Sequence, residues 1–480
     1  MSLINQTATE LLAQLQNESL TPLDLLDALE QRIAEVDDVV NALPTRCFDR
    51  ARAHARELMK KSVKDRGLLC GLPVAIKDLE SVSGVLTTYG SQIFKDFVPQ
   101  GSDCMVELLE ANGAIVYAKT NTPEFGAGAN TFNEVFGQTL NPWNTSKSCA
   151  GSSGGSAVAL ATGMAWLATG SDLGGSLRNP ASFCSVVGFR PSSGRVPHGS
   201  ASPGAYPQEM GGMPHSPYSV AGPMARNVRD TALLFDAMTG HHRCDPRSMP
   251  KESKSFTDAF ESGWAPKRVA YSPDLGVTPV DPEVARLTEH AARRFEELGA
   301  TVELAHPDLS DVQDIFQTNR AVGFYVGHKG LLENKRDLLK PEVVWNIEKA
   351  SDISMDDIER VENLLGSYIQ RSVDFFDDYD LLLTPATIVP PYPVEQRYVE
   401  SCNGVTFDNY IEWLTIAYAI TVTGFPAMSL PVGFTEDNLP VGLQICAGPR
   451  AEHNVLTAAH SLEQLLQLTP AVPIEPLSPA

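Results

Sequence analysis

The chain has 480 residues, of which 43% are hydrophobic and 20% charged, and its formal net charge is −22. This composition is ordinary for a globular protein with a large core, and the acidic balance argues against nucleic acid or anionic lipid as a main partner. The first residues show no basic region followed by an apolar run, so we expect no secretory signal, and no apolar stretch of about 18 residues predicts a membrane span. The cysteines stand singly without a CxxC pair. We therefore expect a cytoplasmic protein with reduced thiols and no zinc site.

The first 66 residues predict helices. Leucines and alanines recur at helical spacing from Thr7 to Gln16. Thr21 and Pro22 are typical of an N-cap and a first helical position, and a second helix then carries one apolar face: Leu25, Leu29, Ile33 and Val36. We expect residues 1–66 to form a helical segment packed on the core.

From Gly71 onward, strands and helices alternate. The apolar runs Pro73–Ile76 and Ala114–Tyr117 predict strands, and Asp103–Glu110 predicts a helix between them. Such alternation favours an α/β architecture in which helices cover a largely buried sheet. A helix of small residues, Ser156–Ala165, is expected in the centre of the molecule.

Further elements are expected in the second half of one large domain that spans residues 67–468. A loop rich in proline, glycine and serine, His198–His215, should lie at the surface near a site. The strands and helices expected after it are Asn227–Met238 (helix), Arg268–Tyr271 (strand), Asp281–Leu298 (helix ending at Gly299), Leu381–Thr384 and Met428–Val432 (strands) and Asn454–Gln467 (helix). The proline-rich tail, residues 469–480, should follow the surface or fray.

Two glycine–serine motifs carry the strongest chemical signal. They are Gly151-Ser-Ser-Gly-Gly-Ser156 and Ser171-Asp-Leu-Gly-Gly-Ser-Leu-Arg178. Glycines beside a serine let the backbone turn sharply and direct several N–H groups to one point, which suits a nucleophilic hydroxyl next to an oxyanion hole. A flexible Gly/Ser loop is the plain alternative, and the repetition of the motif weakens it.

Lys77 is the candidate base. It ends an apolar strand pattern, Gly71-Leu-Pro-Val-Ala-Ile-Lys-Asp78, where burial would disfavour its charged form and lower its pKa. From this segment alone, the favoured interpretation is a structural lysine paired with Asp78 or with a backbone carbonyl.

The chain resembles the amidase signature family from about Gly71 to Pro449. The matching stretches are GLPVAIKD, KTNTPEFGAG, GSSGGSAVALATGMAWLATGSDLGGSLRNPASFCSVVGFRPSSGRVP, GPMARNVRDTALLFDAM and GFPAMSLPVGFTEDNLPVGLQI. The resemblance implies a single α/β domain whose central mixed sheet is covered by helices on both faces. It also implies a hydrolase that cleaves amides without a cofactor or a metal.

By the same resemblance, a Ser–cis-Ser–Lys triad carries the chemistry. Ser176 is then the nucleophile, Ser152 the cis serine that shuttles the proton and Lys77 the base. The backbone N–H groups of Leu173, Gly174, Gly175 and Ser176 would form the oxyanion hole. Gly126 would line the substrate side next to Ser152.

The chain departs from the family pattern near the triad. Cys149 and Ala150 stand where proline and glycine are common, and Asn179 stands where many relatives carry another residue. Asp172 and Arg178, which flank the nucleophile, are interpreted as a structural ion pair.

Three other functions remain as alternatives. Gly151-x-Ser153-x-Gly155 has the form of the nucleophile elbow of α/β-hydrolases, which would make Ser153 the nucleophile of an esterase. The same run before a helix is also a weak candidate for a phosphate cradle. A subunit of a tRNA-dependent amidotransferase shares the resemblance, although Glu412-Trp413 departs from its usual tail pattern.

The substrate itself is less readable than the chemistry. We expect a small aryl or short aliphatic amide, a homodimer and no nucleic-acid partner. The run His241-His-Arg-Cys244 is interpreted as a surface loop rather than a metal site. Candidates for an aromatic pocket are Phe125, Phe132, Phe136, Trp143, Tyr325 and Trp413.

Overall fold

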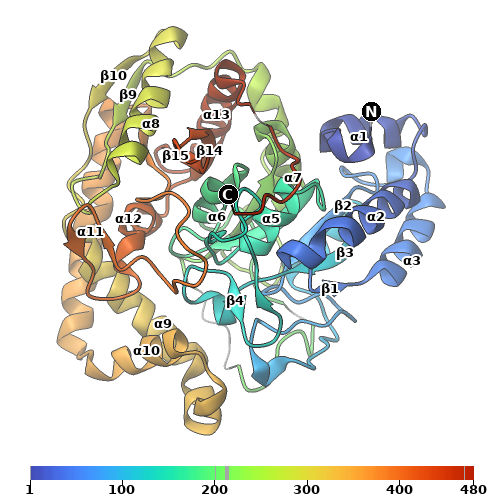
Figure 1. Cartoon of the computed structure of the whole chain (residues 1–480), viewed down its shortest axis with the longest axis horizontal. Helices are drawn as coiled ribbons and strands as arrows, with labels where there is room; N and C mark the ends of the chain where they lie inside the picture. The colour runs from blue at the N-terminus through green and yellow to red at the C-terminus, as the bar shows by residue number, and fades with distance from the viewer. Residues whose placement is uncertain (1, 201, 211–215, 470, 480) are drawn as a thin grey trace.

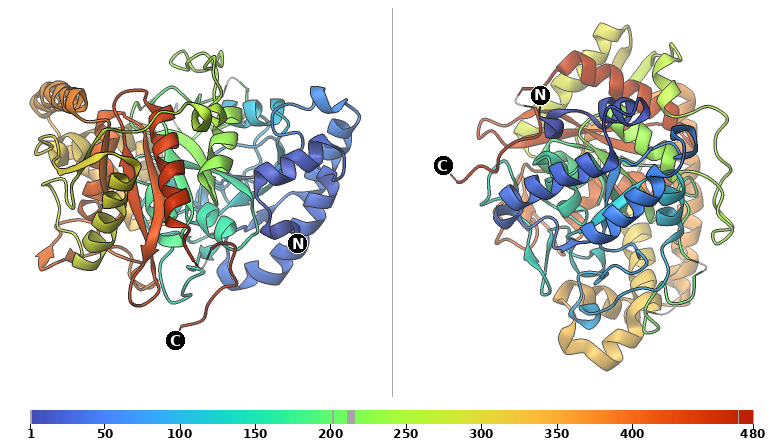
Figure 2. Two further views of the ribbon diagram at one scale, coloured as in Figure 1. Left: turned by 90° about the horizontal axis from the view of Figure 1, so that it is seen from above. Right: turned by 90° about the vertical axis from the view of Figure 1, so that its right-hand side faces the viewer.

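The computed structural model describes residues 2–200, 202–210, 216–469 and 471–479. One mixed sheet of eleven strands crosses the molecule (Figures 1 and 2). Its order is β1 (Thr45–Arg46), β3 (Ile115–Thr120), β2 (Pro73–Lys77), β6 (Leu167–Asp172), β8 (Val220–Ala225), β7 (Val187–Arg190), β14 (Ala427–Phe434), β15 (Pro440–Cys446), β11 (Leu381–Pro385), β9 (Arg268–Tyr271) and β10 (Thr301–Leu304). Two small ladders join β4 (Phe132–Asn133) to β5 (Gly137–Gln138) and β12 (Ser401–Cys402) to β13 (Val405–Thr406).

Parallel and antiparallel pairs alternate in blocks along the sheet. β2 pairs in parallel with β3 and β6, and β9 pairs in parallel with β10 and β11. The pairs between β6 and β8, and from β8 through β7, β14 and β15 to β11, are antiparallel. The expected α/β domain with a mixed sheet is therefore confirmed.

Helices flank this sheet. They are α1 (Ala8–Gln16), α2 (Pro22–Val40), α3 (Phe48–Met59), α4 (Cys104–Ala111), α5 (Gly154–Ala161), α6 (Arg178–Cys184), α7 (Val228–Met238), α8 (Pro282–Arg293), α9 (Val312–Lys335), α10 (Pro341–Lys349), α11 (Met355–Asp378), α12 (Thr415–Thr423) and α13 (Glu452–Leu466). α7 and α13 pack on each other and on β8 and β14, while α5 and α6 pack on each other and on β6 and β7. Every residue of α5 is buried, as its small side chains predict.

The N-terminal helices begin where their caps predict. Thr7 and Thr21 each form a capping box, with Glu10 and Asp24 respectively, and Pro22 occupies the first turn of α2. α2 contacts β2 and α3 contacts β3, so these helices cover one end of the sheet (Figure 1, blue). The division of the chain at residues 66 and 468 stays a prediction.

The chain ends lie against the body of the molecule. In the tail, the N–H groups of Ile474 and Leu477 donate to the carbonyls of Ala161 and Pro142, both at 2.9 Å, so the described part of the tail follows the surface. Residues 201 and 211–215 of the expected surface loop lie outside the described residues. None of the described helices combines the length and apolarity needed to cross a membrane.

Candidate active site

Two parallel strands bring the candidate residues to one edge of the sheet. Lys77 is the last residue of β2, and Asp172 is the last residue of its neighbour β6. Because the carboxyl ends of parallel strands meet at the same edge, the two segments that follow these strands lie side by side. The backbone N–H of Lys77 donates to Thr169 Oγ1 of β6 at 3.1 Å, which joins the strands at this point.

Lys77 points into a cluster of serines. Its side chain is fully buried, and Nζ donates to Ser152 Oγ at 2.7 Å, to Ser153 Oγ at 2.9 Å and to Ser171 Oγ at 3.0 Å. Ser171 was not singled out by the sequence analysis, because only the pairing of β2 with β6 reveals that it lies beside Lys77. An amine surrounded by three hydroxyls is positioned to exchange protons with them.

Of the two structural pairings left open for Lys77, the one with Asp78 is absent, whereas the carbonyl oxygen of Ser171 lies 3.5 Å from Nζ. Asp78 accepts instead from Lys119 Nζ at 2.8 Å and from Thr88 Oγ1 at 2.6 Å, and both partners are buried. With no ion pair to hold its charge, burial lowers the pKa of Lys77 to about 7, although the charges of Glu80 and Asp172 oppose this shift. A neutral amine is therefore accessible near physiological pH.

Ser152 follows a cis peptide bond between Gly151 and Ser152. Its side chain is 3% exposed, so Oγ lies between the buried amine and a cavity. Gly126, which has φ +73°, lies on the cavity side, and a Cβ built on it would come within 3.3 Å of Ser152 Oγ. The glycine therefore leaves room beside this hydroxyl, as expected for a residue on the substrate side.

The loop that carries Ser176 is held by a buried carboxylate. Asp172 accepts the N–H groups of Gly175 at 3.0 Å and Leu177 at 3.1 Å, and it pairs with Arg178 at 2.8 Å and Arg190 at 3.3 Å. Burial alone would raise the pKa of Asp172, but the two guanidinium groups keep it well below its usual range. The expected ion pair with Arg178 is present, and Arg190 is a further partner that the sequence did not indicate.

Gly175 must be glycine. Its φ is +100°, and a Cβ would lie 2.5 Å from Asn179 Oδ1 and 2.6 Å from Ala417 Cβ of α12. A side chain here would displace the loop that carries Ser176 or the helix behind it.

Three of the four expected oxyanion donors have free N–H groups. Within the described residues, the N–H groups of Leu173, Gly174 and Ser176 have no protein acceptor. Gly175 differs from the prediction, because its N–H is already donated to Asp172. In this structure the N–H of Gly175 holds the turn, and the other three N–H groups stay unpaired within the described residues.

Ser152 and Ser176 line one cavity of about 100 Å³. A second cavity of about 180 Å³ shares several of its lining residues, including Leu79, Phe125 and Leu173, so the two cavities lie side by side. Ser153 lines neither; it is fully buried and accepts hydrogen bonds from Lys77 Nζ and from the N–H of Ser171. A nucleophile at Ser153 would have no access to a substrate in this space.

Only Phe125 of the six aromatic candidates lines these cavities. Trp413, for example, is 1% exposed and packs against Tyr392 with ring centroids 5.8 Å apart, outside the cavity walls. The aromatic rings that do line the space come from other segments: Tyr89, Tyr218, Phe316, Phe324, His328 and Tyr410. The expected loop does border the site, since His198, Met210 and Ser216 lie in the wall of the larger cavity.

The run His241–Cys244 forms a loop, as expected. His242 Nε2 lies 3.2 Å from a carboxylate oxygen of Glu107, and His241 Nδ1 faces the carbonyl of Ser248. Within the described residues, the side chains with geometry suited to a metal ion are elsewhere, at Glu80, Asp103 and His198.

Known proteins similar to this chain cover most of its length. A family model described as Amidase matches residues 24–456. The chain is 32% identical over 464 residues to an acylamidase of Rhodococcus erythropolis, covering 95% of this chain and 94% of that one. It is 30% identical over 485 residues to a glutamyl-tRNA(Gln) amidotransferase subunit from Alkaliphilus metalliredigens, covering 94% of each. Among solved structures, a bacterial aryl acylamidase of the amidase signature enzymes superposes with a TM-score of 0.87 at 28% identity, covering 96% of each chain.

Proposed function

The chain belongs to the amidase family, a family of hydrolases that act on amides, and from this premise we propose that it cleaves a small carboxylic amide through an acyl-enzyme on Ser176. The product is a carboxylic acid together with ammonia or an amine. The observation that carries the proposal is the 2.7 Å hydrogen bond from Lys77 Nζ to Ser152 Oγ, in a cavity that Ser176 also lines.

The reaction begins with two linked proton transfers. Neutral Lys77 accepts the proton of Ser152 as Ser152 accepts that of Ser176, and Ser176 Oγ forms a bond to the amide carbon. The N–H groups of Leu173, Gly174 and Ser176 stabilise the negative charge on the carbonyl oxygen. Because the pKa of Lys77 is about 7, a large fraction of its amine is neutral near neutral pH and can accept a proton.

Ser152 then solves the harder half of amide cleavage, which is protonation of the leaving nitrogen. It delivers a proton to that nitrogen as the C–N bond breaks, and Lys77 returns a proton to Ser152. Water attacks the acyl-enzyme by the reverse route and releases the acid. Gly126 leaves space beside Ser152 Oγ for the departing group.

The walls of the cavity favour an aryl or apolar acyl or amine group. Leu79, Phe125 and Phe324 line both parts of the space. Apolar and aromatic surfaces of this kind bind apolar groups by removing them from water. The acylamidase and aryl acylamidase relatives, as their names state, act on acyl amides, and this agrees with the proposed substrate class.

A covalent probe tests the nucleophile directly. A fluorophosphonate or sulfonyl fluoride should label Ser176, because Ser176 lies in the cavity wall and Ser153 is fully buried. Peptide mapping by mass spectrometry after labelling should find the adduct on Ser176, and preincubation with an amide substrate should slow its formation. An adduct on Ser153 instead would restore the nucleophile-elbow hypothesis.

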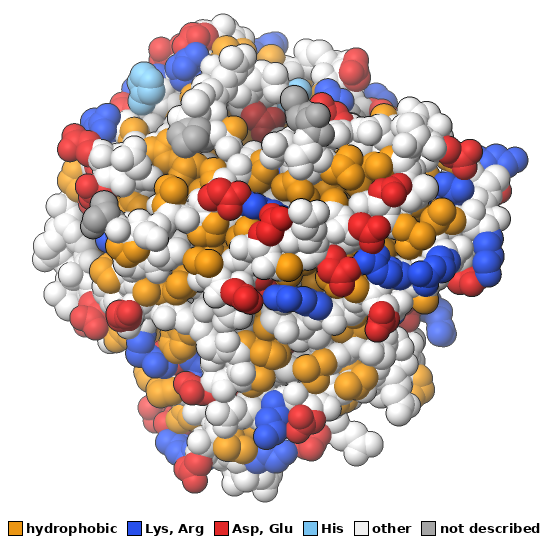
Figure 3. Space-filling model, turned by 45° about the vertical axis from the view of Figure 1, so that its right-hand side comes forward, with side chains coloured by type: hydrophobic (Ala, Val, Ile, Leu, Met, Phe, Trp, Pro, Cys, Tyr) orange, Lys and Arg blue, Asp and Glu red, His pale blue; other side chains and the backbone are white. Residues whose placement is uncertain are grey.

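The second candidate function is that of the amide-cleaving subunit of a glutamine-dependent tRNA amidotransferase. The similarity to such a subunit covers 94% of the chain. Three observations favour the free hydrolase. The net charge is −22, and on the face shown in Figure 3 Lys and Arg side chains are interspersed with Asp and Glu rather than gathered in a basic surface. The larger cavity, next to the one that Ser176 lines, is also bounded mainly by aromatic and apolar side chains.

Activity on its own separates the two functions. The purified chain, without ATP, tRNA or partner chains, should hydrolyse an anilide or another neutral amide faster than glutamine. Ammonia, amine and acid are assayed separately across a panel of primary amides, anilides and esters. Brisk glutamine hydrolysis with no activity on any other amide would instead identify an amidotransferase component, and so would a large stimulation by added partner chains.

We further propose that the protein acts as a homodimer in the cytoplasm, without nucleic acid. All eight cysteines are free thiols, which suits a reducing compartment. The proposed arrangement of the chain is a helical segment over residues 1–66, an amidase domain over 67–468 and a surface tail.

A further inference from the structure

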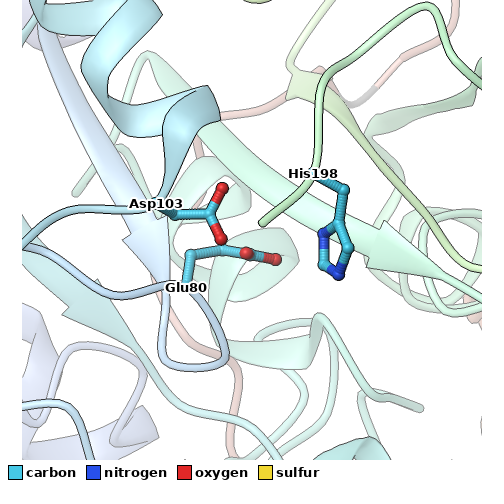
Figure 4. A group of neighbouring side chains, drawn as sticks. All are labelled: Glu80, Asp103 and His198. Atoms are coloured by element: carbon cyan, nitrogen blue, oxygen red, sulfur yellow. The ribbon is translucent and has the colours of Figure 1, made fainter. Parts of the chain in front are cut away.

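Three ligand-type side chains, apart from the proposed triad, lie close together beside the larger cavity, and two of them, Glu80 and His198, line it. Glu80 follows β2, Asp103 caps α4 and His198 begins the long loop after β7. One ligand atom from each lies within 4.8 Å of the others, and all three side chains turn toward a common point (Figure 4). The proposed amide hydrolysis uses none of them.

Glu80 is buried without a hydrogen-bond partner. Its side chain is 3% exposed, and within the described residues no donor reaches its carboxylate. Glu80 lines the larger cavity together with His198. A carboxylate removed from bulk water is unfavourable unless a counter-charge or a proton compensates it. Burial and the neighbouring charge of Asp103 together raise the pKa of Glu80 to about 7, although the nearby positive charges oppose this shift.

The nearby protein cations do not provide that counter-charge by contact. Lys77 Nζ is hydrogen-bonded to serines, and Lys119 Nζ is bonded to Asp78 and Thr87. Neither ring nitrogen of His198 comes within 4.0 Å of an oxygen of Glu80 or Asp103, so these side chains form no direct ion pair. The two carboxylates and the imidazole therefore lie around a common space without forming ion pairs with one another.

The carboxylate of Asp103 is held in its orientation by two hydrogen bonds. Oδ1 accepts the N–H of Met105 at 3.2 Å and Oδ2 accepts the hydroxyl of Tyr206 at 2.6 Å. Each carboxylate oxygen keeps a second lone pair, so these bonds orient the group without preventing it from binding a cation. The ring of His198 makes no hydrogen bond in the described part of the chain, which leaves both nitrogens available.

We propose that Glu80, Asp103 and His198 form a binding site for a divalent transition-metal ion, with Zn²⁺ as the best match. One imidazole and two carboxylates are ligands that Zn²⁺ accepts, and three protein ligands leave a further position open toward the cavity. Ligand atoms around Zn²⁺ lie about 3.3 Å apart, so binding must draw His198 inward toward the two carboxylates. The sequence analysis expected no metal, because the three residues are far apart in the chain.

The bound ion would join the loop after β7 to the core. Glu80 and Asp103 lie on segments next to the sheet, whereas His198 belongs to the loop that also supplies Met210 and Ser216 to the cavity wall. Metal binding would therefore fix the position of this loop in the wall of the larger cavity. The metal site does not depend on the proposed reaction, and its test does not require turnover.

Zinc uptake by the purified full-length protein tests the site. The protein is treated with a chelator, dialysed against Zn²⁺, and its zinc content is measured by elemental mass spectrometry. We expect one zinc per chain, and Co²⁺ should give visible absorption bands when it occupies the same site. Glu80→Gln and His198→Ala should each weaken Zn²⁺ binding at least about 100-fold, because each removes one of three ligands.

His242→Ala is the matched control, because it removes another histidine that lies beside a carboxylate, Glu107, outside the group. It should leave zinc affinity unchanged, and thermal unfolding of each variant checks that the fold is intact. Failure of the wild-type protein to bind zinc would overturn the proposal, as would equal loss of zinc in Glu80→Gln and His242→Ala. If the wild type binds no zinc and Glu80→Gln selectively slows hydrolysis of amides with an ammonium group, the cavity instead recognises a cationic substrate.

Discussion

Ser176→Ala is expected to abolish amide hydrolysis, with a loss in kcat on the order of 10⁶-fold, the scale seen when the nucleophile of a serine hydrolase is removed. The change deletes only a hydroxyl, and within the described residues Ser176 Oγ makes no hydrogen bond to protein. The fold should therefore keep its thermal midpoint. Initial rates on the best amide of the panel, measured beside a melting curve, provide both readouts.

Two other serines make this test specific. Ser219→Ala removes a hydroxyl from the wall of the same cavity, away from Lys77, and should keep most of the activity. Ser153→Ala removes one acceptor of Lys77 Nζ, so it should slow the reaction much less than Ser176→Ala does. Retention of more than a few per cent of the wild-type rate by Ser176→Ala would show that Ser176 is not the nucleophile.

Elements with local signals were predictable from the sequence. The capping boxes at Thr7 and Thr21 define the starts of α1 and α2, and the strand expected at Arg268–Tyr271 is β9 with the same bounds. The helix expected to end at Gly299 does end there, although its last turn, Arg294–Leu298, is a 3₁₀ helix. In these cases a side chain hydrogen-bonds its own turn or a glycine stops the helix, so little depends on distant contacts.

Other elements were missed because their local sequence argues against them. α9 contains Gly323, Gly327 and Gly330, which lower helix propensity, and its packing on α10, α11 and α12 stabilises it instead. β8 contains Gly222 and Pro223, both unfavourable in a central strand. A Cβ on Gly222 would lie 2.2 Å from the carbonyl oxygen of Phe189, so the glycine is present for a close approach that only the sheet reveals.

The residues of the candidate site likewise fall into those that the sequence could predict and those that it could not. The glycine–serine motifs and Lys77 could be chosen from the sequence because each stands in a distinctive run. The contact of Ser171 with Lys77, the contact of Arg190 with Asp172 and the aromatic walls could not be predicted, because they depend on which strands are neighbours. The N–H of Gly175 was assigned to the oxyanion hole, whereas it anchors the loop through Asp172. Backbone donors of one turn look alike in sequence, and only the direction of each N–H separates them.

Lys77→Ala is expected to lower kcat/KM by about 10²–10⁴-fold, the usual contribution of a general base. In the wild-type enzyme the rate should rise with pH through an apparent pKa near 7, because only neutral Lys77 can accept a proton and burial lowers its pKa to about 7. The lysine of the unfolded chain has a pKa of about 10.4, so the unfolded chain binds the extra proton between about pH 7 and 10. The contribution of Lys77 to stability should therefore grow as the pH rises through that range.

The titration of Glu80 must be distinguished from that of Lys77 in the rate–pH profile, because burial also raises the pKa of Glu80 to about 7. Glu80→Gln, assayed on chelator-treated protein, makes the distinction. The Glu80 carboxylate raises the pKa of Lys77, so its removal should keep the acidic limb and move it to lower pH. If the limb belonged to Glu80, it would disappear in Glu80→Gln. A wild-type profile that stays flat down to about pH 5 would exclude a lysine base, since an amine with a pKa near 7 is almost fully protonated there.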